Sequence, residues 1–136
     1  FNEQKEYNRI EKDIQKLDSQ AILDKVLQMQ GVTYVWNDDK TGFTRPEGVQ
    51  YGFIAQDLQM IWPSNISEDT QGYLQTAYGD YDPMFVEAFK AQQAQIEVLK
   101  TQNELYATQI EKQNTAIEQL SLSVEKLTLL IETTGK

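Results

Sequence analysis

The sequence contains neither cysteine nor histidine. Their absence removes disulfides, thiol nucleophiles, the usual zinc sites and any imidazole general base. Basic residues are also scarce, with 12 lysines and arginines against 21 acidic residues and a formal charge of -9. Because no basic patch is available to neutralise phosphates, we expect no nucleic acid partner and no binding to an anionic membrane surface. Much ordinary enzymology is excluded on composition alone.

Several recognisable motifs are missing as well. The sequence shows no signal peptide or membrane-spanning run, and it begins at Phe1 rather than methionine, so we expect it to be a piece of a longer protein. It has no phosphate loop, paired-carboxylate motif or nucleotide fingerprint, and we expect no cofactor. The segment 37–48 imitates the opening of an EF-hand loop at Asn37, Asp39, Thr41 and Gly42. Gly48 stands where that loop requires glutamate, so we expect no metal site.

The clearest positive feature is a heptad repeat from Phe89 to Ile131, uninterrupted by proline or glycine. With Phe89 as position a, ten of the thirteen a and d residues are apolar. These positions, called the seam below, are Phe89, Gln92, Ile96, Leu99, Asn103, Tyr106, Ile110, Gln113, Ile117, Leu120, Val124, Leu127 and Ile131. A strict 3.5-residue repeat of this length predicts a helix, roughly 64 Å long, that winds around copies of itself. A helix of this kind cannot bury its seam alone, so we expect an oligomer.

The remaining heptad positions describe the outside of this helix. Positions e and g are mostly uncharged, so salt bridges do not select the partner, whereas glutamate occupies position b in every heptad from Glu97 to Glu132. The polar seam residues Gln92, Asn103 and Gln113 either penalise shifted registers or are simply tolerated in a long rod. Isoleucine or valine at a with leucine at d favours two strands, but the bulky seam aromatics and the polar layers leave dimer and trimer open.

Before the repeat, the pattern predicts a small mixed domain. We expect an α+β fold, mainly helical, with a head over residues 1–83 and a coiled-coil helix over 84–136. The head should begin with a charged helix to Leu17, with Ile10 and Ile14 on its apolar stripe, followed by a helix capped by Asp18 or Ser19 and ended by Gly31. A hairpin of 32–36 with 49–54 and a helix 55–62 stopped by Pro63 come next. A turn 67–72 and a strand 73–78 complete the head, and the long helix starts at Asp82-Pro83.

Aromatic residues are concentrated in this head, at Trp36, Tyr51, Phe53, Trp62 and Tyr78. Aromatics of this kind can line a carbohydrate groove. In a head this small they more often form the core, and their spacing in predicted strands and at a helix end favours burial.

Three ordered blocks resemble a known family. They are AILDKVLQMQGVTYVW, YGFIAQDLQMIWP and GYLQTAYGDYDPMFVEAFKAQQAQIEVLK, and the similarity around them spans roughly residues 6–100. Together they resemble the endosialidase-type intramolecular chaperone domain, which is found at the C-terminal ends of phage tailspikes and tail fibres, of bacterial surface proteins and of myelin regulatory factors. The most specific part is the stretch Gly52, Phe53, Ile54, Ala55 and Gln56, followed by Pro63.

The resemblance implies a function that the pattern alone does not supply. Members of the family trimerise, hold the ends of a preceding β-helical or fibrous shaft in register while it folds, and then usually cut themselves off. By this resemblance the partners are two further copies of the chain and the upstream shaft of the same polypeptide. The location implied is a virion tail or bacterial cell surface, after folding in the bacterial cytoplasm.

The sequence departs from the family at the self-cleavage motif, Ser-Asp-x-Arg-x-Lys-x-Asn-Ile. Placing Ile14 on the motif isoleucine puts Arg9 on the arginine, but the serine then falls on Glu6 and the lysine on Glu11. A glutamate is neither the alkoxide nucleophile nor a replacement for the lysine base, so we expect no self-cleavage. Alternative interpretations are an autoprotease using Ser19 or Thr33, and a generic coiled-coil oligomerisation module.

Overall fold

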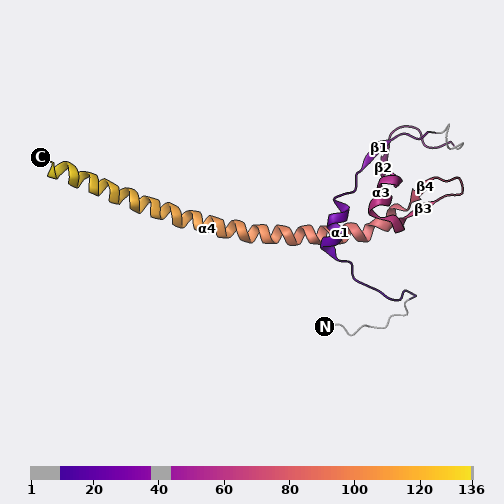
Figure 1. Ribbon diagram of the computed structural model, residues 1–136, viewed down its shortest axis with the longest axis horizontal. Helices are drawn as coiled ribbons and strands as arrows, with labels where there is room; N and C mark the ends of the chain where they lie inside the picture. Colours follow the sequence, from indigo (N-terminus) through magenta and orange to yellow (C-terminus); the bar gives the residue numbers. More distant parts are fainter. Residues whose placement is uncertain (1–9, 38–43, 136) are drawn as a thin grey trace. The chain divides into compact units, whose positions relative to one another are not determined.

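The computed structural model describes residues 10–37 and 44–135, and it divides into two compact units, residues 1–92 and 93–136. Figure 1 labels the helices and strands in chain order. The prediction of a mainly helical α+β chain with a β-hairpin and a long C-terminal helix is confirmed. Of the EF-hand-like positions, Asp39, Thr41 and Gly42 lie outside the described residues.

The first helix, α1, spans Ser19–Val26. Asp18 is its N-cap, because the Asp18 carboxylate accepts a hydrogen bond of 2.9 Å from the backbone N–H of Ala21. The predicted helix before it is wrong over residues 10–18, which contain no helix. Ile10 and Ile14 are 97 % and 58 % exposed there and Asp13 adopts a positive φ of 54°, so the first two residues of the expected apolar stripe remain largely exposed. A thin stripe without a partner surface does not hold a helix.

Two short antiparallel hairpins follow. Strands β1 (Val32–Tyr34) and β2 (Gln50–Gly52) pair with Thr33 opposite Tyr51, as predicted for the first hairpin. Strands β3 (Ile66–Glu68) and β4 (Leu74–Thr76) pair with Ser67 opposite Gln75. The prediction of a turn over 67–72 is therefore wrong at its start, since β3 occupies its first two residues.

Helix α3 (Ala55–Ile61) connects the two hairpins and packs against β3 and β4. It ends before Pro63, which opens the short 3-10 helix η1 (Pro63–Asn65). A second 3-10 helix, η2 (Tyr78–Tyr81), leads directly into α4 (Asp82–Thr134). The predicted start of the long helix at Asp82-Pro83, and its uninterrupted course through the heptad region, are confirmed. None of the helices in the described chain is long and apolar enough to cross a membrane.

The core of the first unit is small and is formed by α1, α3, η2 and the beginning of α4. Its buried members are Ile22, Leu23, Leu58, Trp62, Tyr81, Ala88 and Ala91. The burial expected for Trp62 is thus confirmed, and Leu58 of the predicted helix 55–62 is buried beside it. Tyr51, in contrast, is 79 % exposed, so its predicted burial is wrong in this chain.

Candidate functional site

The sequence resemblance predicts Glu6 and Glu11 at the positions of the family's self-cleavage pair. Glu6 and Arg9 are outside the described residues, while Glu11 is exposed on irregular backbone. Among the described residues, no group of three or more histidine, cysteine, aspartate or glutamate side chains is arranged to hold a metal ion.

Ser19, the alternative nucleophile, forms a hydrogen bond that links α1 to α4. Its Oγ donates a hydrogen bond of 2.6 Å to Glu87 Oε2, while Lys90 Nζ contacts Glu87 Oε1 at 2.6 Å. The bond to Lys90 and then the bond to Ser19 lower the pKa of the Glu87 carboxyl. A carboxylate that is held ionised in this way is a weak general base.

The carbonyl group of the peptide bond before Ser19 is also hydrogen-bonded within the fold. The carbonyl of Asp18 accepts a 2.9 Å hydrogen bond from the backbone N–H of Ile22, which opens the α1 helix. The hydroxyl of Ser19 is directed to Glu87 and not to this carbonyl. Thr33, the other alternative, is an exposed residue of β1 opposite Tyr51, and no base is hydrogen-bonded to it in the described chain. Neither geometry favours a nucleophile.

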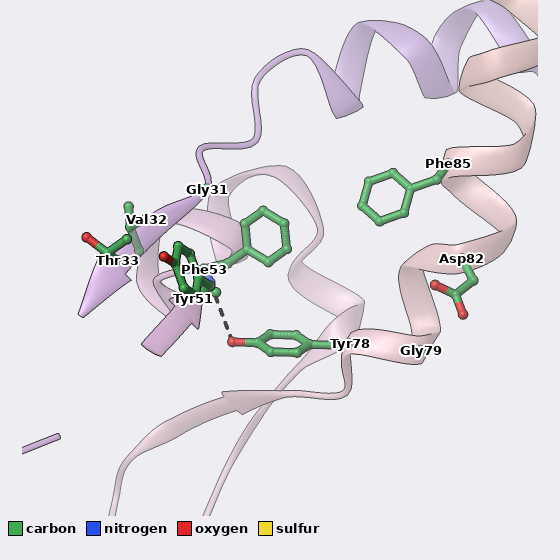
Figure 2. A pocket seen from close by; sticks show the side chains of 10 residues that line it. Gly31, Val32, Thr33, Tyr51, Phe53, Tyr78, Gly79, Asp82 and Phe85 are labelled. Carbon is green, nitrogen blue, oxygen red and sulfur yellow. Dashed lines mark hydrogen bonds between the residues drawn. The ribbon is translucent and has the colours of Figure 1, made fainter. Parts of the chain in front are cut away.

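The stretch Gly52–Gln56 joins the first hairpin to α3. Gly52 ends β2, and Ile54 is the N-cap residue of α3, which begins at Ala55. A Cβ at Gly52 would collide with the Tyr78 hydroxyl and approach Tyr34 Cε1 to 3.3 Å, so a larger residue there would have to displace these side chains. Figure 2 shows the Tyr78 hydroxyl reaching the backbone at Phe53, whose N–H donates to it over 3.4 Å.

The Phe53 side chain continues the same cluster. Its ring lies edge-on to Tyr78, with centroids 5.9 Å apart, and is tilted against Tyr81 at 6.4 Å. Tyr81 is completely buried, and its hydroxyl lies 2.8 Å from Thr76 Oγ1, which in turn donates to the Asn65 carbonyl. The most specific part of the resemblance therefore fixes the hairpin, α3 and η2 to one another.

The other aromatics of the first hairpin are only partly covered. Trp36 carries the Arg45 guanidinium over its ring at 4.1 Å and lies edge-to-face with Tyr34 at 5.0 Å. Burial raises the pKa of the Tyr34 phenol, and the neighbouring Tyr78 raises it further. These aromatics pack against neighbours within the head, as expected for core residues, although Tyr78 remains 49 % exposed.

A cavity of about 880 Å³ opens beside this cluster. It is walled by the hairpin on one side and by η2 and the start of α4 on the other, and the rings of Phe53 and Phe85 lie on opposite sides of it (Figure 2). The described residues that line it are Gly31, Val32, Thr33, Tyr51, Gly52, Phe53, Tyr78, Gly79, Asp82 and Phe85. Asp82 is the only charged residue among these described lining residues.

The seam is the second candidate surface. Phe89 and Gln92 lie in the first unit, and the remaining seam positions lie on α4 in the second unit. In the second unit every apolar seam residue is exposed, from 45 % at Ile96 to 71 % at Ile131. Single exposed apolar residues are ordinary, but a continuous stripe of this length marks an interaction surface.

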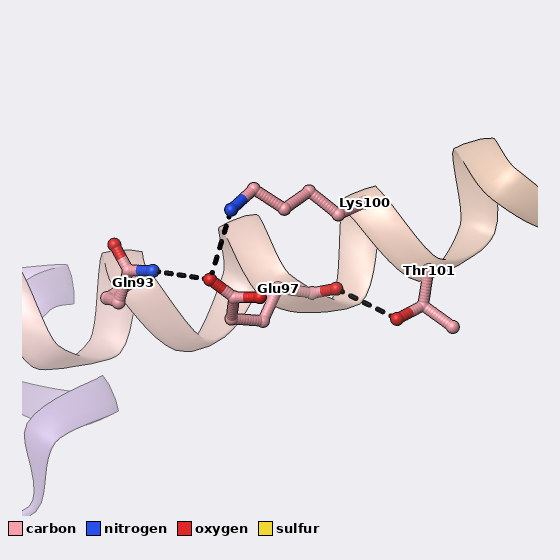
Figure 3. A network of polar contacts seen from close by, with 4 residues as sticks. All are labelled: Gln93, Glu97, Lys100 and Thr101. Atoms are coloured by element: carbon pink, nitrogen blue, oxygen red, sulfur yellow. Dashed lines mark hydrogen bonds and ion pairs between the residues drawn. The ribbon is translucent and has the colours of Figure 1, made fainter.

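Another face of α4 in the second unit is polar and internally bonded. Glu97 Oε1 accepts hydrogen bonds from Gln93 at 2.6 Å and from Lys100 at 3.3 Å (Figure 3). Threonines spaced by seven, at positions 101, 108 and 115, each return a hydrogen bond of 3.1 Å to the carbonyl four residues earlier. These bonds satisfy the polar side chains locally, which suits a face in contact with water.

Two residues of the first unit were not singled out by the sequence pattern. Tyr81 looks like one more tyrosine in a polar turn, and no local signal marks it as the most buried side chain. The bond of Glu87 to Ser19 spans 68 positions of sequence. The spacing of Glu87 and Lys90 was the one signal available, and it indicates only an exposed helical ion pair.

The fold and these surfaces together define a class: a mainly helical chain whose small hairpin-bearing head precedes a long helix with an unburied heptad seam. Residues 8–67 match the model of a peptidase family described as chaperone of endosialidase. The resemblance seen in the sequence is therefore confirmed over this segment, which contains the first two of the three blocks and all six motif residues from Gly52 to Gln56 and at Pro63. The match supports a chaperone role. No curated protein matches the chain.

Proposed function

We propose that this chain is a trimerising assembly chaperone for a fibrous or β-helical shaft that precedes it in the same polypeptide, and that it does not cut itself off. The observation that carries this proposal is the exposed seam on α4, which accompanies a head matched by the chaperone family. A helix that holds its apolar stripe in water requires copies of itself.

The energetics favour association strongly. Fully burying a valine, leucine or isoleucine side chain stabilises by about 1.5–3 kcal/mol relative to leaving it in water. The second unit alone carries nine apolar seam residues that are exposed by 45 % or more. Burial of these side chains between chains opposes the loss of translational and rotational freedom on association, which costs about 4–15 kcal/mol.

The number of chains comes from the family and not from the heptads. Endosialidase-type chaperone domains are trimers, and three copies place the three polar seam residues in layers of like side chains. A trimeric clamp brings the ends of three shaft strands together and raises their effective concentration. Because a multi-chain β shaft has few local contacts, aligning its ends removes a slow step of folding.

The partners and location of the whole protein follow from the same proposal. The chain associates with two copies of itself and with the shaft of its own polypeptide, and it uses no cofactor, metal, nucleic acid or membrane. The parent protein is a phage tail fibre or tailspike, or a bacterial surface fibre. It folds in the bacterial cytoplasm before it reaches the virion tail or the cell surface.

The decisive experiment is the absolute mass of the purified chain, measured by light scattering behind a sizing column. We expect three chains. Ile117→Lys places a charge in the seam and should reduce the mass to that of a monomer at micromolar concentration. The matched control Gln119→Lys adds the same charge at heptad position c and should remain trimeric. A wild-type dimer or monomer would overturn the trimeric chaperone and leave a generic oligomerisation module as the better description.

A further inference from the structure

The cavity of about 880 Å³ beside the first hairpin has a chemical character of its own. Its walls are mainly apolar and aromatic, with Phe53 and Phe85 facing each other and Tyr78 along one side (Figure 2). The volume falls within the roughly 300–1,000 Å³ typical of ligand sites. The residues that line it include no seam residue and neither partner of the Ser19–Glu87 hydrogen bond.

Among the described residues that line this cavity, one is charged. Asp82, the first residue of α4, lies one helical turn before Phe85 and lines the same wall. Its carboxylate makes no hydrogen bond or ion pair with any residue in the described parts of the chain, 10–37 and 44–135. An unpaired carboxylate beside aromatic faces is suited to a cation on an apolar stem, because the rings attract the positive charge and the stem packs on them.

We propose that this cavity, which we call the client groove, binds a lysine- or arginine-bearing extended segment of the polypeptide being assembled. This inference rests on the proposed chaperone function and names what the head recognises in its client. Charge complementarity supports a basic occupant, because the chain carries a formal charge of -9 and the groove presents a carboxylate without a cation.

The neighbouring strands favour an extended occupant. Val32 and Thr33 of β1 and Tyr51 and Gly52 of β2 line the groove, and these two strands form a sheet of only two strands. Each strand has one paired edge in the described structure, so its other edge offers backbone N–H and C=O groups to an added strand. The backbone of a segment with alternating apolar and basic residues pairs with the strand edge, and its side chains enter the groove.

The test uses the complete chain in its assembled form and three blocked pentapeptides of alternating valine with lysine, glutamine or glutamate, titrated by calorimetry. We expect the lysine peptide to bind, the glutamine peptide to bind about tenfold or more weakly, and the glutamate peptide not to bind. The methyl resonances of Val32 should shift with the lysine peptide, while those of Val98, in the second unit, should not. Binding that is equal for the three peptides, or absent for all, overturns the inference.

Variants locate the binding. Asp82→Asn keeps a residue that is well tolerated at a helix start and should weaken the lysine peptide about tenfold or more, while Phe85→Leu should weaken it through lost ring contact. Asp80→Asn is the matched control, because it removes the same charge two residues away and outside the groove lining. If Asp80→Asn weakens binding as much as Asp82→Asn, the attraction is a general charge effect and the client groove is wrong.

The mass of each sample separates this inference from the proposed function. A trimer that binds no peptide overturns the client groove and leaves the assembly role standing. A chain that binds the lysine peptide without trimerising supports the groove and removes the clamp. If dilution of the chain alone moves the Val32 resonances and no peptide binds, the occupant is a second copy of the chain and the proposal is overturned.

Discussion

Tyr78 leaves no space for a side chain at position 52. We predict that Gly52→Ala lowers the free energy of unfolding of the first unit by about 1–3 kcal/mol, because the added methyl group must displace the Tyr78 hydroxyl or the hairpin. Urea unfolding followed by tryptophan fluorescence measures this, since Trp36 and Trp62, the two tryptophans of the chain, both lie in the first unit.

The control for this prediction is Gly79→Ala. A Cβ at Gly79 meets no atom within 4 Å, so its cost should be small. Tyr78→Phe removes the obstructing oxygen, and adding it to Gly52→Ala should recover part of the loss, giving a measurable coupling between the two sites. Equal costs at positions 52 and 79, or no coupling, would contradict the steric explanation.

Glu87 should make the first unit sensitive to acid. Its pKa is lowered in the folded chain by Lys90 and then by Ser19, so folding favours the ionised form. The resulting stability is present above the ordinary glutamate pKa of about 4.3 and is lost as the pH falls through the lowered value.

We predict that Glu87→Gln lowers the urea midpoint at pH 7 and reduces the difference in midpoint between pH 7 and pH 3. The matched control is Glu97→Gln, since Glu97 carries a comparable ion pair with Lys100 but lies in the second unit. It should leave the tryptophan-monitored transition unchanged. A wild-type difference that persists in full in Glu87→Gln would assign the acid sensitivity to other carboxylates.

At the scale of single residues, the sequence predicts what depends on neighbours along the chain. Asp18 as a helix cap and Pro63 as a helix stop follow from local chemistry, and both are confirmed. The burial of Tyr81 and the exposure of Tyr51 depend on which elements meet in space. An alternating strand pattern says that two faces differ, but it does not say which face a small domain leaves open.

The helices and strands likewise divide into those that local sequence predicts and those that depend on contacts in space. The long helix was predictable to its first residue, because the heptad repeat from Phe89 carries a strong periodic signal and Asp82-Pro83 is a typical helix start. The helix expected before Leu17 rested on three apolar residues without an identified partner, and residues 10–18 do not form it. Strand β3 follows a 3-10 turn and is three residues long, which is too short for alternation to distinguish it from a loop.

The polar layers of the seam should set the alignment of the helices. We predict that Asn103→Ile raises the stability of the assembly by about 1–3 kcal/mol per chain, since an amide no longer has to be buried. The same change should lower specificity, so that light scattering detects a second mass or a mixture of registers. Thermal melting followed by circular dichroism measures the first effect.

Thr108→Ile is the matched control for this substitution. Position 108 is an f site, where the side chain bonds to its own helix and faces away from the seam, so the mass should stay unchanged. If Asn103→Ile leaves a single trimer with unaltered register, the polar layer is only tolerated in the rod, and alignment comes from the head or from the remaining seam residues.

For the whole molecule, the sequence predicts that chains associate, but not how many. The seam can be recognised in the sequence because its period is fixed over many turns. A dimer and a trimer differ in how side chains pack between chains, and the heptad pattern of this sequence does not decide between these two packings. The chaperone role likewise came from ordered family blocks and not from burial or charge. The client groove is not predictable from the sequence, because Val32, Phe53 and Asp82 come from segments that no sequence period connects.

The final prediction concerns the intact parent protein. We expect a longer precursor that extends upstream of Phe1 to remain uncut, because the sequence resemblance predicts Glu6 and Glu11 at the positions of the family's serine and lysine. Intact-mass spectrometry of the precursor during several days of incubation measures this. Ser19→Ala should not change the mass pattern, since the Ser19 hydroxyl is bonded to Glu87 and the Asp18 carbonyl is held within the start of α1.

Restoring the family pair gives the complementary test. Glu6→Ser with Glu11→Lys supplies a hydroxyl nucleophile and an amine base at the family spacing, and we expect a fragment that begins at residue 6, because the serine attacks the peptide bond on its own N-terminal side. Glu6→Ser alone lacks the base and should remain intact. A wild-type fragment that begins near this boundary would instead mean that the chain cuts itself with a different nucleophile. The clamp would then act only until release, rather than staying attached to the finished shaft.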